Sequence, residues 1–104
     1  MSTLINLPGV AGGRIDNVPF FNSVSQAIRL LSTYRACTGA GDHGAATVYR
    51  GDDGRFHCVF HRHCIELDQT IVTTKKDVRR WLVEWYPRLD EGAKHECRSD
   101  AART

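Results

Sequence analysis

The sequence lacks any long apolar run: no stretch approaches the roughly 18 consecutive apolar residues that a membrane-spanning helix needs. Residues 1–21 also lack a basic segment followed by an apolar one, which is the pattern of a secretory signal. Net charge is small as well, because 14 Lys and Arg residues face 12 Asp and Glu residues, giving +2. These absences predict a cytoplasmic protein with no membrane segment, and a charge balance that does not by itself indicate nucleic acid.

The four cysteines include no Cys-x-x-Cys pair, the spacing most typical of structural zinc ligands. Four is also the count of a two-disulfide framework, but without a secretory signal free thiols are the better interpretation. The alternative is a zinc site built from His61, His63, Cys64 and one residue of the C-terminal tail. Strand alternation instead favours a core cysteine at Cys58 and surface histidines at the hairpin tip, so we predict no metal and no cofactor.

Residues suited to catalysis are present, but their spacing does not support an enzyme. Cys37, Asp42 and His43 are the types used in nucleophilic catalysis, yet they share one short glycine-rich loop that would not hold a triad in geometry. The run at residues 39–44 matches G-x-G-x-x-G, but it follows a predicted helix and leads into a strand. A dinucleotide-binding motif needs the reverse order. We therefore expect a non-enzymatic protein.

The length of 104 residues allows one domain, and 41% hydrophobic with 25% charged residues is typical of a globular chain. We predict an extended lead-in at residues 1–21, a single α+β domain at residues 22–89 and a flexible charged tail at residues 90–104. Within the domain, a helix begins at Ser23 or Asn22, with Gln26 completing a capping box, and ends at Gly39.

A glycine-rich loop at residues 37–45 leads into three predicted strands, at residues 46–50, 55–61 and 64–72. Asp53-Gly54 marks the hairpin turn between the first two strands. The last helix begins at Thr74, a capping residue, and Pro87 stops it. The order α-β-β-β-α predicts an α+β fold in which two helices pack on one face of a three-stranded antiparallel sheet. Whether residues 3–7 add a fourth, N-terminal strand stays open.

Strand alternation predicts which side chains the helices cover. A turn centred on residues 62–63 pairs Phe60 with Ile65, and directly paired residues share a face. This register gives an apolar face under the helices: Tyr49, Phe56, Cys58, Phe60, Ile65 and Leu67. The opposite face is expected to be polar and open to solvent: Arg50, His57, Val59, His61, Cys64, Glu66, Asp68 and Thr70. On it His57 faces Asp68 as a cross-strand ion pair. A four-residue turn preserves this assignment, and a bulge would reverse it.

The last predicted helix carries a cluster of basic residues: Lys75, Lys76, Arg79 and Arg80. Helical spacing places Lys76, Arg79 and Arg80 close enough to contact neighbouring phosphates. Thr-Lys-Lys-Asp-Val-Arg at residues 74–79, after a helix and three strands, resembles double-stranded-RNA-binding domains, whose last helix opens with Ser-Lys-Lys-x-Ala-Lys. Trp81 and Leu82 stand where that family has small residues. The resemblance implies nucleic-acid binding by the basic face of this helix.

The function we expect is that of a small non-enzymatic protein-binding module, either an adaptor or a stoichiometric inhibitor. Phage- and plasmid-encoded inhibitors such as anti-CRISPR proteins belong to this class, and no motif here singles one out. Eleven of the 14 basic residues are Arg, which favours bidentate and stacked contacts at interfaces. The partner is an unidentified protein, with the chain a monomer or homodimer. Its contacts should fall on the polar sheet face (Arg50, His57, His61, Glu66, Asp68) or on the basic helix face. The alternative is the double-stranded-RNA-binding-like nucleic-acid module.

Overall fold

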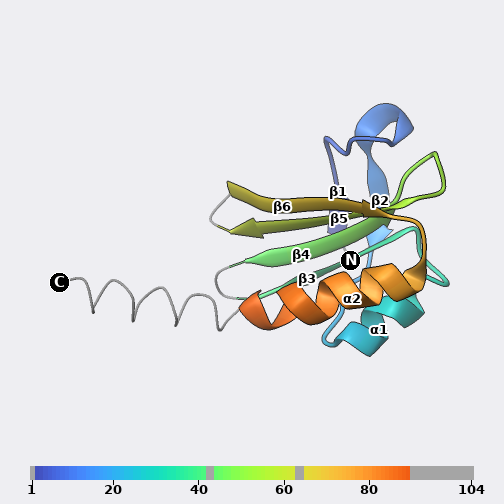
Figure 1. Ribbon diagram of the computed structural model, residues 1–104. Helices are drawn as coiled ribbons and strands as arrows, with labels where there is room; N and C mark the ends of the chain where they lie inside the picture. Colours follow the sequence, from blue (N-terminus) through green and yellow to red (C-terminus); the bar gives the residue numbers. More distant parts are fainter. Residues whose placement is uncertain (1, 42–43, 63–64, 90–104) are drawn as a thin grey trace.

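The computed structural model describes residues 2–41, 44–62 and 65–89. Its elements are β1 (Ser2–Leu4), η1 (Ala11–Gly13), β2 (Ile15–Val18), α1 (Val24–Leu30), β3 (Ala36–Ala40), β4 (Ala45–Arg50), β5 (Phe56–Arg62), β6 (Ile65–Val72), α2 (Lys75–Trp85) and η2 (Tyr86–Leu89). No helix in this part of the chain is long and apolar enough to cross a membrane. The fold is α+β, as the sequence predicted, and Figure 1 shows α1 and α2 together on one side of the larger sheet.

The main sheet has four antiparallel strands in the order β3-β4-β5-β6, and β1 and β2 form a separate two-stranded sheet. The predicted three-stranded sheet is therefore wrong, and so is the predicted end of the first helix at Gly39. Helix α1 ends at Leu30, and β3 occupies residues predicted to be helix and loop. The fourth strand is not N-terminal, because β1 pairs with β2 instead.

Strand β3 has the small-residue sequence Ala-Cys-Thr-Gly-Ala, which carries little β propensity of its own. Tertiary packing explains its conformation. Gly39 lies under the Phe21 ring, and a Cβ built on Gly39 would stand 2.5 Å from Phe21 Cε2. A glycine is therefore required at position 39, because the Phe21 ring rests directly on the backbone there. Backbone hydrogen bonds of Thr38 to the Pro19 and Phe21 segment add a short parallel bridge along its outer edge.

The main sheet is covered on both faces. On one face, Val48, Cys58 and Phe60 pack with the buried helix residues Val78 and Leu82. On the other face the N-terminal segment contributes a second buried cluster, which consists of Val10, Ile15, Val18, Ala36, Tyr49 and Val59. The Tyr49 hydroxyl donates a 2.9 Å hydrogen bond to the Pro8 carbonyl. Residues 1–21 therefore include a small sheet whose side chains help to bury the back of the main sheet.

Several local signals are confirmed. The Ser23 hydroxyl accepts the Gln26 N–H at the start of α1, and the Thr74 hydroxyl accepts the Asp77 N–H at the start of α2. The β4–β5 hairpin turns where predicted, with Gly54 at φ +79°. Such a left-handed conformation costs glycine little and other residues more.

The register between β5 and β6 differs from the predicted one because the strand pair contains a bulge. Phe60 pairs with Asp68, while the next residue, His61, pairs with Glu66, so Leu67 has no partner opposite it. The extra residue reverses the sides of β6 beyond the hairpin tip. Asp68 and Thr70 consequently share the helix-covered face with Phe60 and Cys58, whereas they were predicted on the opposite face.

The side chains of β4 also point to the opposite faces of the sheet from those predicted, although the strand is antiparallel to β5 as expected. Tyr49 pairs with His57 on the N-terminal side, and Arg50 pairs with Phe56 on the helix side. The predicted open polar face is therefore wrong. His57 is 4% exposed because the N-terminal segment covers it, and its ring stacks on Tyr49 with 4.9 Å between centroids. It does not face Asp68; it pairs with Ile71.

Candidate functional site: the groove between β6 and α2

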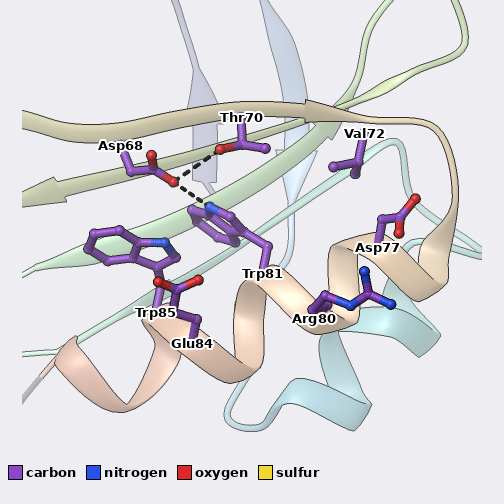
Figure 2. Close-up of a pocket in the computed structure, with 8 residues that line it drawn as sticks. All are labelled: Asp68, Thr70, Val72, Asp77, Arg80, Trp81, Glu84 and Trp85. Carbon is purple, nitrogen blue, oxygen red and sulfur yellow. Dashed lines mark hydrogen bonds between the residues drawn. The ribbon is translucent and has the colours of Figure 1, made fainter.

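Within the described residues, a hollow lies between the last strand and the last helix (Figure 2). Its volume is about 330 Å³, at the lower end of the range for small-ligand sites. Eight side chains line it: Asp68, Thr70 and Val72 from β6, and Asp77, Arg80, Trp81, Glu84 and Trp85 from α2. We call this hollow the β6–α2 groove.

Alternation along β6 supplies one wall of the groove. Asp68, Thr70 and Val72 pair with Phe60, Cys58 and Phe56, so all three point to the helix-covered side. The bulge at Leu67 sets this phase, because regular pairing continued from the hairpin tip would put Leu67 opposite Phe60 and turn Asp68 to the other side of the sheet. A strand with its polar side chains turned toward a helix leaves a polar floor rather than a sealed apolar core.

Helix α2 supplies the other wall through its period of 3.6 residues. Val78, Trp81 and Leu82 are buried and anchor the helix on the sheet. Trp85, one turn beyond Trp81, is partly buried, and the centroids of the two indole rings are 6.4 Å apart. Glu84 projects from the flank of this stripe into the groove.

Asp68 is the polar centre of the groove. Its Oδ2 accepts a 2.6 Å hydrogen bond from Trp81 Nε1 and a 3.2 Å bond from Thr70 Oγ1. Both bonds go to one carboxylate oxygen, and within the described part of the chain Oδ1 has no such bond. The hydrogen bond from Trp81 Nε1 fixes the orientation of that indole relative to the Asp68 carboxylate.

The groove has two chemically different ends. Figure 2 shows Asp68, Glu84 and both indoles toward one end, and Arg80 with Asp77 toward the other. Asp77 also accepts a 2.9 Å hydrogen bond from Thr74 Oγ1 as part of the helix cap. The lining holds three carboxylate residues and one guanidinium, so the end with the indoles is acidic and aromatic.

Of the residues predicted on the polar sheet face, the structure brings His61 and Glu66 together as an exposed cross-strand pair. It separates the others. Asp68 lines the groove, His57 is buried, and Arg50 lies over the Phe56 ring with Cζ 5.2 Å from the centroid. The five residues thus do not form one surface.

Among the four predicted basic helix residues, Lys76, Arg79 and Arg80 are exposed on α2. Lys75 is half-buried and donates a 2.6 Å hydrogen bond from Nζ to Ser32 Oγ near the end of α1. Arg80 also lines the groove. Four strands precede α2 in the main sheet, so the helix–three strands–helix order on which the resemblance to double-stranded-RNA-binding domains rested is not met.

The cysteines that the structure describes are core residues. Cys37 and Cys58 are free thiols with no exposed surface, and burial raises the pKa of each to about 12. A thiol of that pKa is a poor nucleophile near neutral pH. Asp42 and His43, considered with Cys37 as a triad, and His63 and Cys64, considered for zinc, lie outside the described residues, as does the tail at residues 90–104.

Sequence reasoning missed the groove because it placed Asp68 and Thr70 on the face of the sheet opposite the helices, whereas both line the groove. The sequence did contain one signal, which is the presence of two tryptophans one helical turn apart with Glu84 between them. Trp85, the second of them, is only partly buried. Comparisons with protein-family models, with curated proteins and with solved structures find no match to this chain. The geometry described above therefore carries the functional argument.

Proposed function

We propose that the protein is a small non-enzymatic binding module that holds a protein partner along β6 and the β6–α2 groove. The carrying observation is that β6 is an eight-residue edge strand with three exposed apolar side chains: Ile65 (62%), Leu67 (45%) and Ile71 (48%). In the described residues no strand pairs with its outer edge. An open edge of this kind is a template for another strand unless a protein blunts it.

Strand addition is a common mode of protein recognition. Main-chain hydrogen bonds to the open edge supply affinity, and pockets beside the edge read alternate side chains. This chain offers both parts, because the β6–α2 groove runs beside the open strand. An adaptor or a stoichiometric inhibitor needs no more than such a surface.

The proposal is tested by purifying the tagged chain from its native host and identifying what comes with it by mass spectrometry. Two variants, Leu67→Lys and Ile71→Lys, place a charge on the β6 edge, a device by which natural sheets block strand addition. Val83→Lys is the matched control, since Val83 is an exposed apolar residue on α2 and does not line the groove. We expect the β6 variants to lose the partner and the control to keep it. A partner retained by both β6 variants, or the absence of any partner, contradicts the proposal.

A nucleic-acid-binding module is the second proposal, and it is supported by the exposure of Lys76, Arg79 and Arg80 along one helix. Binding to duplex RNA and DNA at two salt concentrations tests it. Phosphate contacts predict affinity that falls steeply with salt and drops in the Lys76→Glu and Arg79→Glu variants. Lack of binding to either duplex at low salt eliminates this function.

A further inference from the structure

The β6–α2 groove is acidic and aromatic at one end, and this chemistry specifies an occupant. We propose that it receives a basic side chain, arginine in the first place, from an extended partner segment that adds beside β6. This inference rests on the proposed binding function and names the chemistry of its partner. Asp68 and Glu84 supply carboxylate acceptors, and the partly buried Trp85 contributes the indole beside which a cation would be stabilised. Trp81 is buried and holds Asp68 in place through its Nε1 hydrogen bond.

The protein already pairs guanidinium groups with aromatic rings on this side of the sheet. Arg50 Cζ lies 5.2 Å from the centroid of Phe56, and Arg62 Cζ lies 5.8 Å from that of Phe60. These contacts fall within the range of about 6 Å over which a cation is attracted to a ring face. The groove offers the same kind of ring surface beside two acidic groups.

An added strand would present alternate side chains to the two sides of the sheet. Those on the side of Asp68, Thr70 and Val72 would enter the groove, and the others would lie on the side of Ile71. The expected partner segment therefore alternates a basic residue with apolar residues. A single basic side chain fits the volume of about 330 Å³ and the one acidic end.

A second copy of the chain fits this edge less well. Two β6 strands laid side by side would bring both Glu66 residues and both Asp68 residues to the joint, and like charges on neighbouring strands are destabilising. A segment carrying a positive charge meets the same edge with attraction. Charge complementarity therefore selects a basic partner over self-association.

The test uses two capped peptides, Thr-Val-Arg-Val-Thr and its twin with citrulline in place of arginine. Citrulline has nearly the same shape without the positive charge. The chain has two tryptophans and both line the groove, so intrinsic fluorescence and the indole N–H signals report directly on it. Amide signals of β6 report separately on strand addition. We expect the arginine peptide to bind about tenfold more tightly than the citrulline peptide and to shift both indole signals.

Three variants complete the design. Glu84→Gln and Asp68→Asn should each remove most of the preference for arginine, and Glu84, being exposed, can be changed without disturbing the core. Asp16→Asn on β2 is the matched control for the loss of one negative charge outside the groove, and it should keep the preference.

Equal binding of the two peptides at β6 would overturn the basic-side-chain inference while leaving strand addition intact. Failure of both peptides at millimolar concentration would overturn it as well, and the native-partner experiment with Leu67→Lys and Ile71→Lys would then decide the proposed function on its own. A tenfold preference that survives both Glu84→Gln and Asp68→Asn would place the cation elsewhere and also overturn the inference.

Discussion

Gly39 shows how much one missing methyl group can matter in this fold. Its Cα faces the Phe21 ring, and a Cβ would meet Cε2 at 2.5 Å, closer than packed atoms can stand. We expect Gly39→Ala to lower the free energy of unfolding by about 1–3 kcal/mol, because the ring must move within a close-packed core. Urea denaturation followed by fluorescence measures the change.

A second substitution separates overpacking from a general loss of sheet structure. In the double variant Gly39→Ala with Phe21→Leu, the smaller side chain leaves room for the new methyl group. The combined loss should then be clearly smaller than the sum of the two single losses. Additive losses would show that Gly39 is needed for some reason other than the ring above it.

The residues best predicted from the sequence are those whose roles depend on near neighbours. Ser23 and Thr74 cap their helices as their spacing to Gln26 and Asp77 indicated, and Gly54 sits at the turn. His57 was misplaced because its burial depends on Gly9, far away in the chain, whose missing side chain leaves space for the imidazole. A pattern read along one strand does not contain that information.

At the scale of elements, the Thr74 cap stabilises the first turn of α2, the helix that carries five of the groove residues. Thr74 accepts the Asp77 N–H at 3.2 Å, and replacing a capping hydroxyl by alanine costs typically about 1 kcal/mol. We expect Thr74→Ala to lower stability by that amount in chemical denaturation. Thr73→Ala, an exposed neighbour outside the helix, should change it by less than about 0.5 kcal/mol. Equal effects at the two positions would show that the cap bond contributes nothing.

Two elements escaped prediction for physical reasons. Strand β3 is built from small residues, and its conformation comes from the Phe21 ring above it and from β4 beside it. The bulge at Leu67 could not be recognised in the sequence, because the apolar residues Ile65, Leu67 and Ile71 of β6 are exposed and their spacing does not show which side of the strand is covered. The candidate site depends on that bulge, so it could not be located before the register was known.

At the scale of the whole molecule, the N-terminal sheet is part of the folded core. Val18 is fully buried against the back of the main sheet. We expect Val18→Ala to lower the global free energy of unfolding by about 2 kcal/mol, for the lost methyl groups and the space they leave. The tryptophans lie on the opposite side of the sheet, so a shift of their unfolding midpoint measures coupling through the entire fold.

Ile5→Ala gives the corresponding control within the same segment. Ile5 is 63% exposed, and its truncation should change stability by less than about 0.5 kcal/mol. If Val18→Ala had an equally small effect on the tryptophan transition, residues 1–21 would behave as the extended lead-in that the sequence suggested.

Acid should loosen the attachment of the N-terminal segment. The pKa of Asp52 is held below its usual value, first by the hydrogen bond from Arg35 (2.7 Å) and then by the Ala11 N–H (2.7 Å). A carboxylate whose pKa is lower in the folded state stabilises the fold above its unfolded pKa of about 3.9. That stabilisation is lost as the pH falls through the lower, folded value.

The corresponding measurement is the unfolding midpoint as a function of pH between about 6 and 2. We expect the native chain to lose stability below about pH 4, and Asp52→Asn to show a shallower loss over the same range. Asp16 and Asp53 have pKa values lowered in the same direction, so part of the slope should remain. An unchanged slope in Asp52→Asn would show that its links to Arg35 and Ala11 carry no free energy.

The surplus residue at position 67 has one more consequence. The pairs on either side of it, Phe60 with Asp68 and His61 with Glu66, would be continuous if it were absent. The hairpin tip and the part of β6 that lines the groove therefore follow two different pairing registers, which meet at Leu67. A homologue with a one-residue deletion at Leu67 would keep all the other backbone pairs between β5 and β6. We therefore expect a deletion at this position to be tolerated by the sheet.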